Sequence, residues 1–359
     1  MTYGSTETRM AAAVTIGLDV SDQYTSVCVL DDEGTVVEEA RVRTTTPALA
    51  RRFSVVPPCR IVLEVGTHSP WMSRLLAGLG HEVIVANPRR VRLIAESDRK
   101  RDRTDAELLA RLGRVDPGLL RPIQHRGPEA QQDLALLRAR DALVRARTNL
   151  INHVRGAVKA VGGRLPACSA ASFHRKAEAH LPVALRAVLL PIVSMVAELT
   201  TRIRDYDRQV ERLAERYPAG QLLRQVRGVG PLTAFAFLLV IEDPARFRKS
   251  REVGPYLGLV PRQSQSGERE PQLSITKAGD PLLRRLLVQS AHYVLGPFGP
   301  DTELRRWGLR LAGSGSSRGK KRAVVAVARK LAVLLHRLWV TGEVYQPLLD
   351  ETAAPARAG

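Results

Sequence analysis

Alternating apolar and polar residues predict five short β-strands in the first quarter of the chain. The strands are expected at residues 14–20, 25–30, 35–42, 60–65 and 82–86. A polar turn at 31–34 separates the second and third strands, and helical spacing follows Pro47 and covers residues 70–80. Three strands followed by alternating helices and strands predict a mixed α/β sheet with helices packed on it.

Two carboxylates end hydrophobic strands of this predicted sheet, Asp19 in the first strand and Glu64 in the fourth. A charge at such a position is costly to bury unless it lies at the open end of the sheet, where ligand sites form in α/β folds. Either acid taken alone is more often an ordinary strand-end residue. The interpretation as a site therefore depends on further ligands elsewhere in the chain.

A second pair of carboxylates, Asp102 and Asp105, lies in a basic run just before an apolar helical pattern. If the helix extends back through Asp102, the i,i+3 spacing places both acids on one side. The alternative is a capping box, in which Thr104 caps the helix with Glu107 as its partner, and Asp105 is a favourable first-turn acid. Four converging carboxylates would repel one another and need a cation, and two Mg²⁺ ions held there could polarise a phosphodiester.

The composition changes at Pro128, where glycine becomes rare and two long helical patterns begin. The first pattern has apolar heptad positions at Leu137, Val144, Ile151 and Val158. The second, over residues 191–217, has an apolar seam formed by Ile192, Val196, Leu199, Ile203, Tyr206, Val210, Leu213 and Tyr217. Heptad seams predict coiled-coil pairing, either of the two helices with each other or with a second subunit, and we favour a role in dimerisation.

The first long helix also carries a series of arginines, which are Arg138, Arg140, Arg145, Arg147 and Arg155. We expect them to face nucleic acid, and the alternative is a solvated charged face.

The last third of the chain is predicted to be mainly helical, with two loops of functional interest. Gly228-Val229-Gly230 resembles the turn of helix-hairpin-helix modules, whose backbone N–H groups approach a phosphate, although it could be a plain glycine turn. A later polar loop contains Ser266 between Arg262 and Arg269, and a serine there is usually only a turn residue. Further basic residues suited to phosphate contact are Lys277, Arg318, Lys320 and Lys321.

The charge balance indicates a polyanionic partner, since 55 Lys and Arg against 36 Asp and Glu give a formal net charge of +19. Nucleic acid is the commonest such partner. Three scattered cysteines indicate a reducing compartment, and no histidine or cysteine spacing predicts zinc. We expect no apolar run of membrane-spanning length and no secretory segment, and hence a cytoplasmic protein that joins the nucleoid when bound to DNA.

The order of short motifs along the chain resembles one known family. The motifs are Gly-Leu-Asp-Val at 17–20, Leu-Glu-Val-Gly at 63–66, Ala-Asn-Pro at 86–88, Asp-x-x-Asp-Ala at 102–106, Gly-Val-Gly-x-x-Thr-Ala at 228–234, Tyr-x-Gly-Leu-x-Pro-Arg at 256–262, Ser-Gly at 266–267 and Lys-x-Gly at 277–279. The set is similar to the DEDD-type insertion-sequence transposases, the bridge-RNA-guided serine recombinases. The resemblance covers residues 14 to 345.

The resemblance implies three regions: a RuvC-like, ribonuclease-H-type domain at 14–125, a coiled-coil dimerisation region at 126–218 and a C-terminal transposase domain at 219–345. The acids that hold Mg²⁺ would be Asp19, Glu64, Asp102 and Asp105. The nucleophile that forms a covalent link to DNA would be Ser266, with Ser264 as the second possibility.

The resemblance also implies partners. The acids of one subunit and the serine of another would form a composite site, which requires a homo-oligomer, a dimer or a tetramer. A structured non-coding RNA from the element would pair with both donor and target DNA. Residues assigned to nucleic-acid contact are Arg138, Arg145, Gly228, Gly230, Arg262, Lys277, Arg318, Lys320 and Lys321.

Two other functions are compatible with parts of this pattern. One is a metal-dependent, structure-specific DNA nuclease, such as a junction resolvase, in which Ser266 has no chemical role. The other is a nucleic-acid-binding protein without catalysis. Covalent attachment of Ser266 to DNA distinguishes the recombinase from the first, and a requirement for the four acids distinguishes it from the second.

Overall fold

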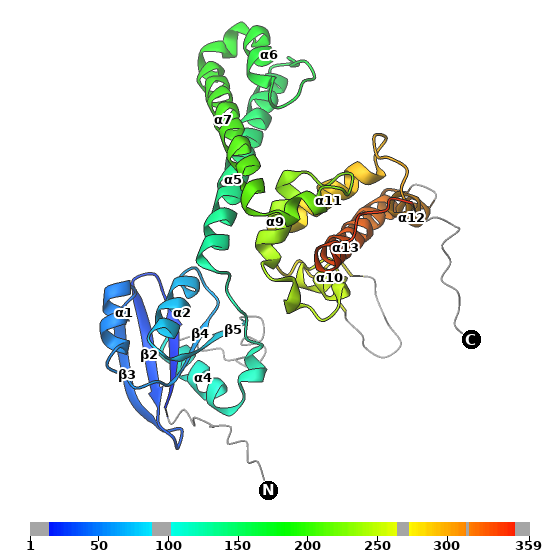
Figure 1. Cartoon of the computed structure of the whole chain (residues 1–359). Coiled ribbons are helices and arrows are strands. Elements are labelled where there is room, and N and C mark those ends of the chain that lie inside the picture. Colours follow the sequence, from blue (N-terminus) through cyan, green and yellow to red (C-terminus); the bar gives the residue numbers. More distant parts are fainter. Residues whose placement is uncertain (1–13, 88–101, 264–272, 314–315, 349–359) are drawn as a thin grey trace, which may run out of the picture. The chain divides into compact units, whose positions relative to one another are not determined.

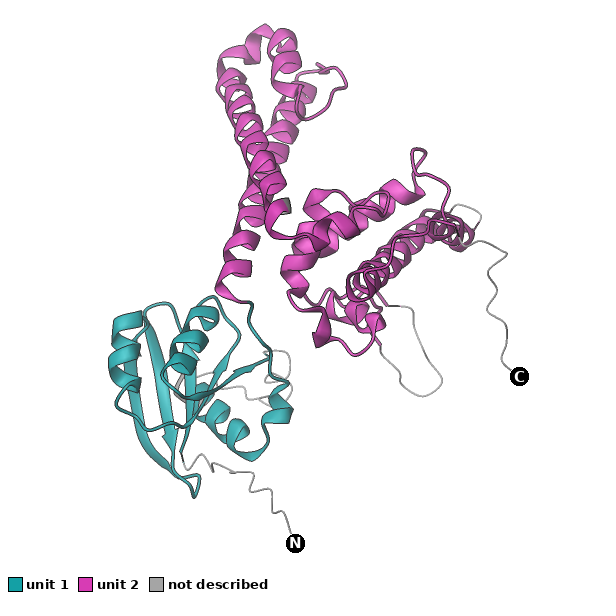
Figure 2. Cartoon of the chain, in the orientation of Figure 1, with its two compact units in different colours: residues 1–126 teal, residues 127–359 magenta. Residues whose placement is uncertain are grey.

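The computed structural model describes residues 14–87, 102–263, 273–313 and 316–348, without the side chains of residues 102–104 and 214. Ser266, its alternative Ser264 and the neighbouring Arg269 lie outside the described residues. The chain forms two compact units, residues 1–126 and residues 127–359, shown in separate colours in Figure 2.

The first unit contains one five-stranded mixed sheet, with a strand at each of the five predicted places (Figure 1). The strands are β1 (Thr15–Val20), β2 (Tyr24–Leu30), β3 (Val36–Arg43), β4 (Arg60–Glu64) and β5 (Glu82–Ala86), in the spatial order β3-β2-β1-β4-β5. β2 is antiparallel to both β1 and β3, while β1, β4 and β5 run parallel. The expected mixed α/β sheet is confirmed.

Helices cover both faces of this sheet. On one face, α1 (Thr46–Phe53) and α2 (Ser69–Gly78) bury a core against β1, β2, β4 and β5, with Leu18 and Leu63 fully buried in it. On the opposite face, α4 (Asp102–Val115) and the short 3₁₀ turn η1 (Pro117–Leu120) cover the other side of the central strands.

The helix α4 includes Asp102, its first described residue, as the extended-helix hypothesis requires. Thr104 therefore lies inside the helix and does not precede it as an N-cap. The side chain of Glu107 accepts a hydrogen bond from Arg111, one turn later, at 2.8 Å. The capping-box alternative was wrong.

The second unit begins with two long helices, α5 (Pro128–Ala160) and α7 (Val183–Arg216), joined through the short helix α6 (Phe173–His180). They run antiparallel, because Arg140 pairs with Asp207 at 2.5 Å while Arg147 donates to Thr200 at 3.3 Å. The partner of the second heptad seam within the chain is therefore the first long helix. The buried seam of α7 comprises Leu189, Val193, Val196, Thr200, Ile203, Val210 and Leu213. Coiled-coil geometry and dimerisation stay predictions.

Two of the arginines expected to face nucleic acid lie between these helices. Arg140 is only 19% exposed in its ion pair, and the Nε atom of Arg147 is buried without a hydrogen-bond partner. Burial is also the main cause that lowers the pKa of Arg147, with Arg140 as a further cause. For Arg140 and Arg147 the expectation of a nucleic-acid contact was wrong, because a heptad pattern does not reveal which face its partner helix covers.

By length and composition, the helical stretch Val183–Leu213 is apolar enough to cross a membrane, so the expectation that no such run exists was wrong. A single helix of this kind is weak evidence for a membrane protein, because the assignment rests on length and composition alone and helices of soluble proteins also meet it.

The rest of the second unit is a helical assembly around α9 (Pro231–Ile241), whose residues from Thr233 onward are all buried. The other helices are α8 (Ala219–Leu223), α10 (Val253–Tyr256), α11 (Pro281–Leu295), α12 (Glu303–Ala312) and α13 (Ser317–Thr341), with 3₁₀ turns η2 (Pro244–Arg246) and η3 (Ser250–Glu252). α9 is apolar all round, as a central core helix must be.

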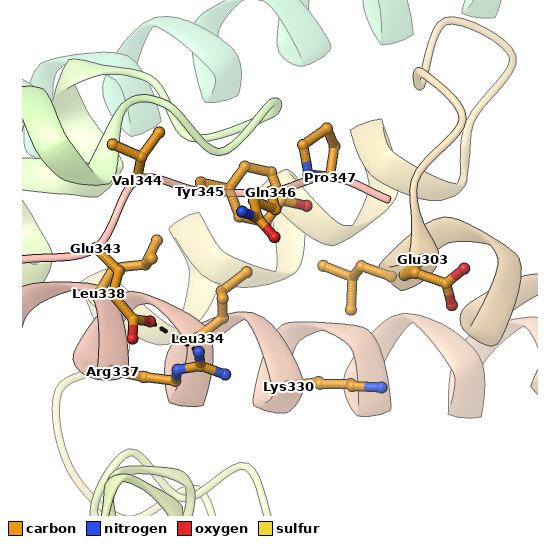
Figure 3. Close-up of a pocket in the computed structure, with 11 residues that line it drawn as sticks. Glu303, Lys330, Leu334, Arg337, Leu338, Glu343, Val344, Tyr345, Gln346 and Pro347 are labelled. Atoms are coloured by element: carbon orange, nitrogen blue, oxygen red, sulfur yellow. Dashed lines mark hydrogen bonds and ion pairs between the residues drawn. The ribbon is translucent and has the colours of Figure 1, made fainter. Parts of the chain in front are cut away.

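The segment after α13 folds back over that helix and lines one side of an open cavity of about 590 Å³ (Figure 3). The backbone N–H of Tyr345 donates to Gln225 at 3.0 Å. Arg337 and Glu343 of the cavity form an ion pair at 2.7 Å. Acids and bases both line this cavity, so it lacks the positive excess of a phosphate site.

Candidate functional site

Asp19 and Glu64 lie side by side at the carboxyl ends of β1 and β4. The parallel register pairs Leu18 with Leu63, and each acid is the next residue of its strand. Both are partly buried and line a cavity of about 290 Å³ together with the residues that follow each strand. The expectation that these two acids share one edge of the sheet is therefore met by the register itself.

Both acids belong to the face of the sheet that α4 covers. Gly17 lies against α4, since a Cβ atom on it would be 1.9 Å from the carbonyl oxygen of Ala106. Val62 packs in the same layer, with Gly113 of α4 directly opposite. Because side chains alternate along a strand, Asp19 and Glu64, each two residues further on, face the same side.

The direction of α4 brings its first turn to this same edge. Arg60 at the start of β4 donates to the carbonyl of Gly113 at 3.1 Å, and Arg114 donates to the carbonyl of Asp31 at 3.3 Å. The carboxyl end of α4 therefore lies at the beginning of β1 and β4, and its amino end lies at their carboxyl ends.

The first turn of α4 is at the level of the strand-end acids. From Ala106 back to Asp102 a helix advances about 6 Å, and from Gly17 on to Asp19 a strand advances about 7 Å. The start of α4, which carries Asp102 and Asp105, therefore lies toward the edge of the sheet at which Asp19 and Glu64 end their strands. The positive end of the helix dipole also favours ionised carboxylates at this place.

Oxygen donors of this kind fit a hard divalent cation such as Mg²⁺. Asp19, Glu64 and Asp105 would supply them, together with Asp102, whose side chain is outside the described part of the chain. Within that part, no three ligating side chains are already grouped as a metal site.

A histidine that the sequence did not single out also lines this cavity. The ring of His68 accepts a hydrogen bond on Nδ1 from the indole N–H of Trp71 at 3.2 Å, so its Nε2 carries the proton and faces Asp22 at 3.1 Å. The sequence could have pointed to His68 by its position, because it lies a few residues after the strand that ends at Glu64 and directly before α2.

The turn that follows Glu64 is fixed by a buried serine. The hydroxyl of Ser69 donates to the carbonyl of Gly66 at 2.8 Å and accepts from its N–H at 3.0 Å. Because the hydroxyl proton of Ser69 already bonds to the carbonyl of Gly66, the Ser69 oxygen is the acceptor, and Nε2 of His125 donates to it at 2.9 Å. Burial, and then Arg74 and Arg126, lower the pKa of His125.

In the second unit, the segment that contains Ser266 is anchored at both ends. The backbone N–H of Arg262 donates to Ser274 at 3.0 Å, and that of Thr276 donates to Val260 at 2.9 Å. Pro261 and Ile275 form an antiparallel bridge. The two flanks of the predicted serine loop therefore pair like a short hairpin.

Two glycines allow the base of this loop to pack tightly. At Gly258, with φ +67°, a Cβ atom would be 2.2 Å from the backbone N of Ala278. At Gly279, with φ +71°, it would be 2.2 Å from the carbonyl oxygen of Tyr256. Between these contacts Lys277 has φ 54°, a left-handed conformation that is uncommon outside glycine.

Other predicted nucleic-acid residues occupy several places in the second unit. Arg138 is half exposed and pairs with Asp280, while Arg145 is mostly exposed and pairs with Asp141. The exposed Gly230 precedes the first turn of α9. Gly228, with φ +94°, forms the turn before it. Three exposed cations follow the serine-capped start of α13, namely Arg318, Lys320 and Lys321.

Comparison of the sequence with known proteins identifies the family of the chain. A family model for DEDD transposases of the IS110 type, described as "Transposase", matches residues 16–162, and the model "Transposase IS116/IS110/IS902 family" matches residues 220–303. A transposase for insertion sequence element IS1111A from Coxiella burnetii is 31% identical over 92% of this chain and 91% of its own length. A transposase for element IS1328 from Yersinia enterocolitica is 30% identical over 77% and 82% of the two chains. A pilin gene-inverting protein from Moraxella lacunata is 26% identical over 71% of each.

These matches define a DNA transposase, an enzyme of the recombinase class. The chain belongs to the IS110 family of insertion-sequence transposases.

Proposed function

We propose that this transposase cuts and rejoins DNA by serine transesterification, with a divalent cation held by Asp19, Glu64, Asp102 and Asp105. The observation that carries the proposal is the convergence of the start of α4 on the paired ends of β1 and β4. That arrangement supports a RuvC-like, ribonuclease-H-type assignment for residues 14–125. Mg²⁺ is the cation we assign, because the donors are all carboxylate oxygens.

In the proposed step, the hydroxyl oxygen of Ser266 bonds to the phosphorus of a DNA phosphodiester. The bond from phosphorus to the leaving strand oxygen breaks, the serine proton passes to a base, and the leaving oxygen takes up a proton. A bound divalent cation would reduce the charge that builds up on the phosphate oxygens. One ester is exchanged for another, so rejoining to a second strand needs no external energy source.

The chain's own residues have distinct tasks in this scheme. The hairpin-like pairing around residues 258–262 and 274–277 holds the serine segment at its base. Arg262 donates to the hydroxyl of Ser274 at 3.0 Å and is exposed, so it is available to a phosphate near that base. The exposed Gly230 just before α9 and the exposed first turn of α13 offer backbone N–H groups and cations to the DNA backbone.

We further propose that the acids and the serine act together from different subunits, which requires a dimer or tetramer. Residues 126–218 would supply the dimerisation region and residues 219–345 the transposase domain. A structured RNA from the element would select both DNA partners. Two observations support these points: the family membership and the charge of +19, which suits extensive contact with nucleic acid. The gene-inverting relative from Moraxella supports DNA rearrangement as the outcome.

The test is to trap the covalent intermediate. The protein is incubated with DNA of the element end, the adjoining transcript and Mg²⁺, and a protein–DNA adduct is sought on a denaturing gel. We expect the adduct to be lost in Ser266→Ala and Asp19→Asn and retained in Ser264→Ala. Asp32→Asn, in an exposed turn of the same unit, is the matched control and should form the adduct normally.

Two results would redirect the proposal. Cleavage without an adduct, unaffected by Ser266→Ala but abolished by Asp19→Asn, would indicate a plain metal-dependent nuclease. An adduct that forms equally well without the transcript would contradict RNA guidance and leave the serine chemistry intact.

A further inference from the structure

The second unit contains another cavity, of about 720 Å³, next to the anchored base of the serine segment. Leu259 and Pro261 line it on one flank of that segment, and Leu273 and Ile275 line it on the other. The opposite wall comes from α12 and from the first half of α13, which pack against each other (Figure 1). The cavity therefore lies beside the two paired flanks of the segment that contains the predicted nucleophile.

The floor of this cavity is aliphatic. Leu259 is fully buried, Val325 and Ile275 are partly buried, and Leu311 of α12 is 40% exposed. A continuous apolar surface that stays open to water is unfavourable, so a ligand that covers this floor would be stabilised by burying it.

The rim is cationic. Arg318, Lys321, Arg322 and Arg329 all come from α13 and line the cavity, while none of its lining residues is an acid. Among the residues that the structure describes, none of these four cations forms an ion pair with a carboxylate, although other arginines of the unit do. A ligand that matches this cavity has an apolar, flat or compact body and at least one strong negative charge.

We propose that this cavity receives an unpaired nucleotide of the DNA strand, with its base on the aliphatic floor and its phosphates on the α13 cations. A paired duplex offers phosphates but keeps its base faces stacked, so it would satisfy the rim and leave the floor uncovered. A cavity of 720 Å³ lies in the size range of small-molecule sites and accommodates a nucleotide. The inference rests on the proposed DNA chemistry and adds to it a device that holds one nucleotide outside the duplex beside the serine segment.

The first test compares two leucines of α12. Leu311 lines the cavity, while Leu309 on the same helix is 45% exposed and does not line it. The probes are a fully paired element-end duplex and the same duplex with one extrahelical 2-aminopurine, moved along the strand. Wild-type protein should prefer the extrahelical probe by at least about fivefold at one position. Leu311→Asp should lose that preference, and Leu309→Asp should keep it.

The fluorescence of 2-aminopurine gives a second readout. Stacking quenches this base, and the cavity lining contains no aromatic side chain. Its fluorescence should therefore rise on binding to wild type and to Leu309→Asp, and stay low with Leu311→Asp. Equal thermal stability of the two variants shows that neither has simply unfolded.

A charge-matched pair tests the rim. Lys321 lines the cavity and Lys320 does not, while both are exposed on the same turn of α13. Lys321→Gln should reduce binding of the extrahelical probe more than binding of the paired duplex, and Lys320→Gln should reduce both to the same small extent.

The outcomes separate this inference from the proposed function. If wild type forms the covalent adduct but no probe position gives preference or fluorescence change, the cavity does not hold an unpaired nucleotide and the serine chemistry stands. If an RNA duplex with the same extrahelical base binds more tightly than the DNA probe, the commitment to DNA is overturned. If wild type binds and cleaves no DNA, the proposed function itself fails.

Discussion

The close contact between β1 and α4 makes Gly17→Ala the most informative single change in the acid-bearing unit. An added methyl carbon would be 1.9 Å from the carbonyl oxygen of Ala106 and 2.7 Å from the backbone N of Ala110. Contacts shorter than 3.0 Å are essentially never seen for real Cβ atoms, so α4 must move away by about 1 Å. Both obstacles are backbone atoms, so no side-chain rotation can relieve the clash.

Two consequences follow from this displacement. Overpacking of a close interface costs on the order of 1–3 kcal/mol in the free energy of unfolding. The same movement shifts the first turn of α4, with Asp105, relative to Asp19 and Glu64, and a misplacement of about 1 Å can cost about a hundredfold in rate. Gly17→Ala should therefore lose much more activity than its loss of stability explains.

The assay is urea unfolding of the variant alongside the rate of adduct formation on element-end DNA at a temperature where it stays folded. Gly78→Ala is the matched control, because a Cβ atom on that helix residue meets nothing within 4 Å. It should leave adduct formation unchanged and should not lower the stability, because alanine favours the helical conformation more than glycine does. Wild-type stability together with wild-type adduct formation in Gly17→Ala would refute the assigned packing and the role given to α4.

Three further changes test other parts of the account. Gly258→Ala, at φ +67° and 2.2 Å from the N of Ala278, should distort the base of the serine segment and suppress adduct formation while element-end DNA still binds in a gel-shift assay. Asp133→Ala removes the acceptor of Tyr217, whose pKa is raised to about 12, and should cost on the order of 2–4 kcal/mol in urea unfolding. His125 has a lowered pKa in the folded protein, so its stabilisation is present above the ordinary histidine value of 6.5 and is lost as the pH falls below it. Melting temperatures should therefore fall less steeply below pH 6.5 in His125→Gln than in wild type, and parallel curves would contradict that cause.

Strand pattern and strand ends were the parts of this fold that the sequence predicted best. The strands β1, β2, β4 and β5 alternate or are largely apolar, and buried strands tolerate few other residues. The acids Asp19 and Glu64 were recognisable because a charge ends an otherwise apolar run. That the two acids lie close together also follows from the topology, because neighbouring parallel strands end at the same edge of the sheet.

Features that depend on tertiary partners were not predictable in this way. The heptads indicated pairing but not which helix would cover which face, so Arg140 and Arg147 were misplaced on an outer surface. Thr104 fitted a local capping signal, but the helix already includes Asp102. His68 was missed because a lone histidine carries no spacing signal, and only the turn after β4 brings it to the acids.

The measurement that tests the central claim most directly is identification of the residue joined to DNA. The trapped adduct is digested with trypsin, which cleaves after Arg262 and Arg269 and releases one short peptide that contains both candidate serines. Fragmentation of that peptide by mass spectrometry then assigns the attached nucleotide. We predict a nucleotide on Ser266, formed only when Mg²⁺ and intact Asp19 are present. A nucleotide on any other residue, or strand exchange by a protein that never becomes linked to DNA, would contradict it.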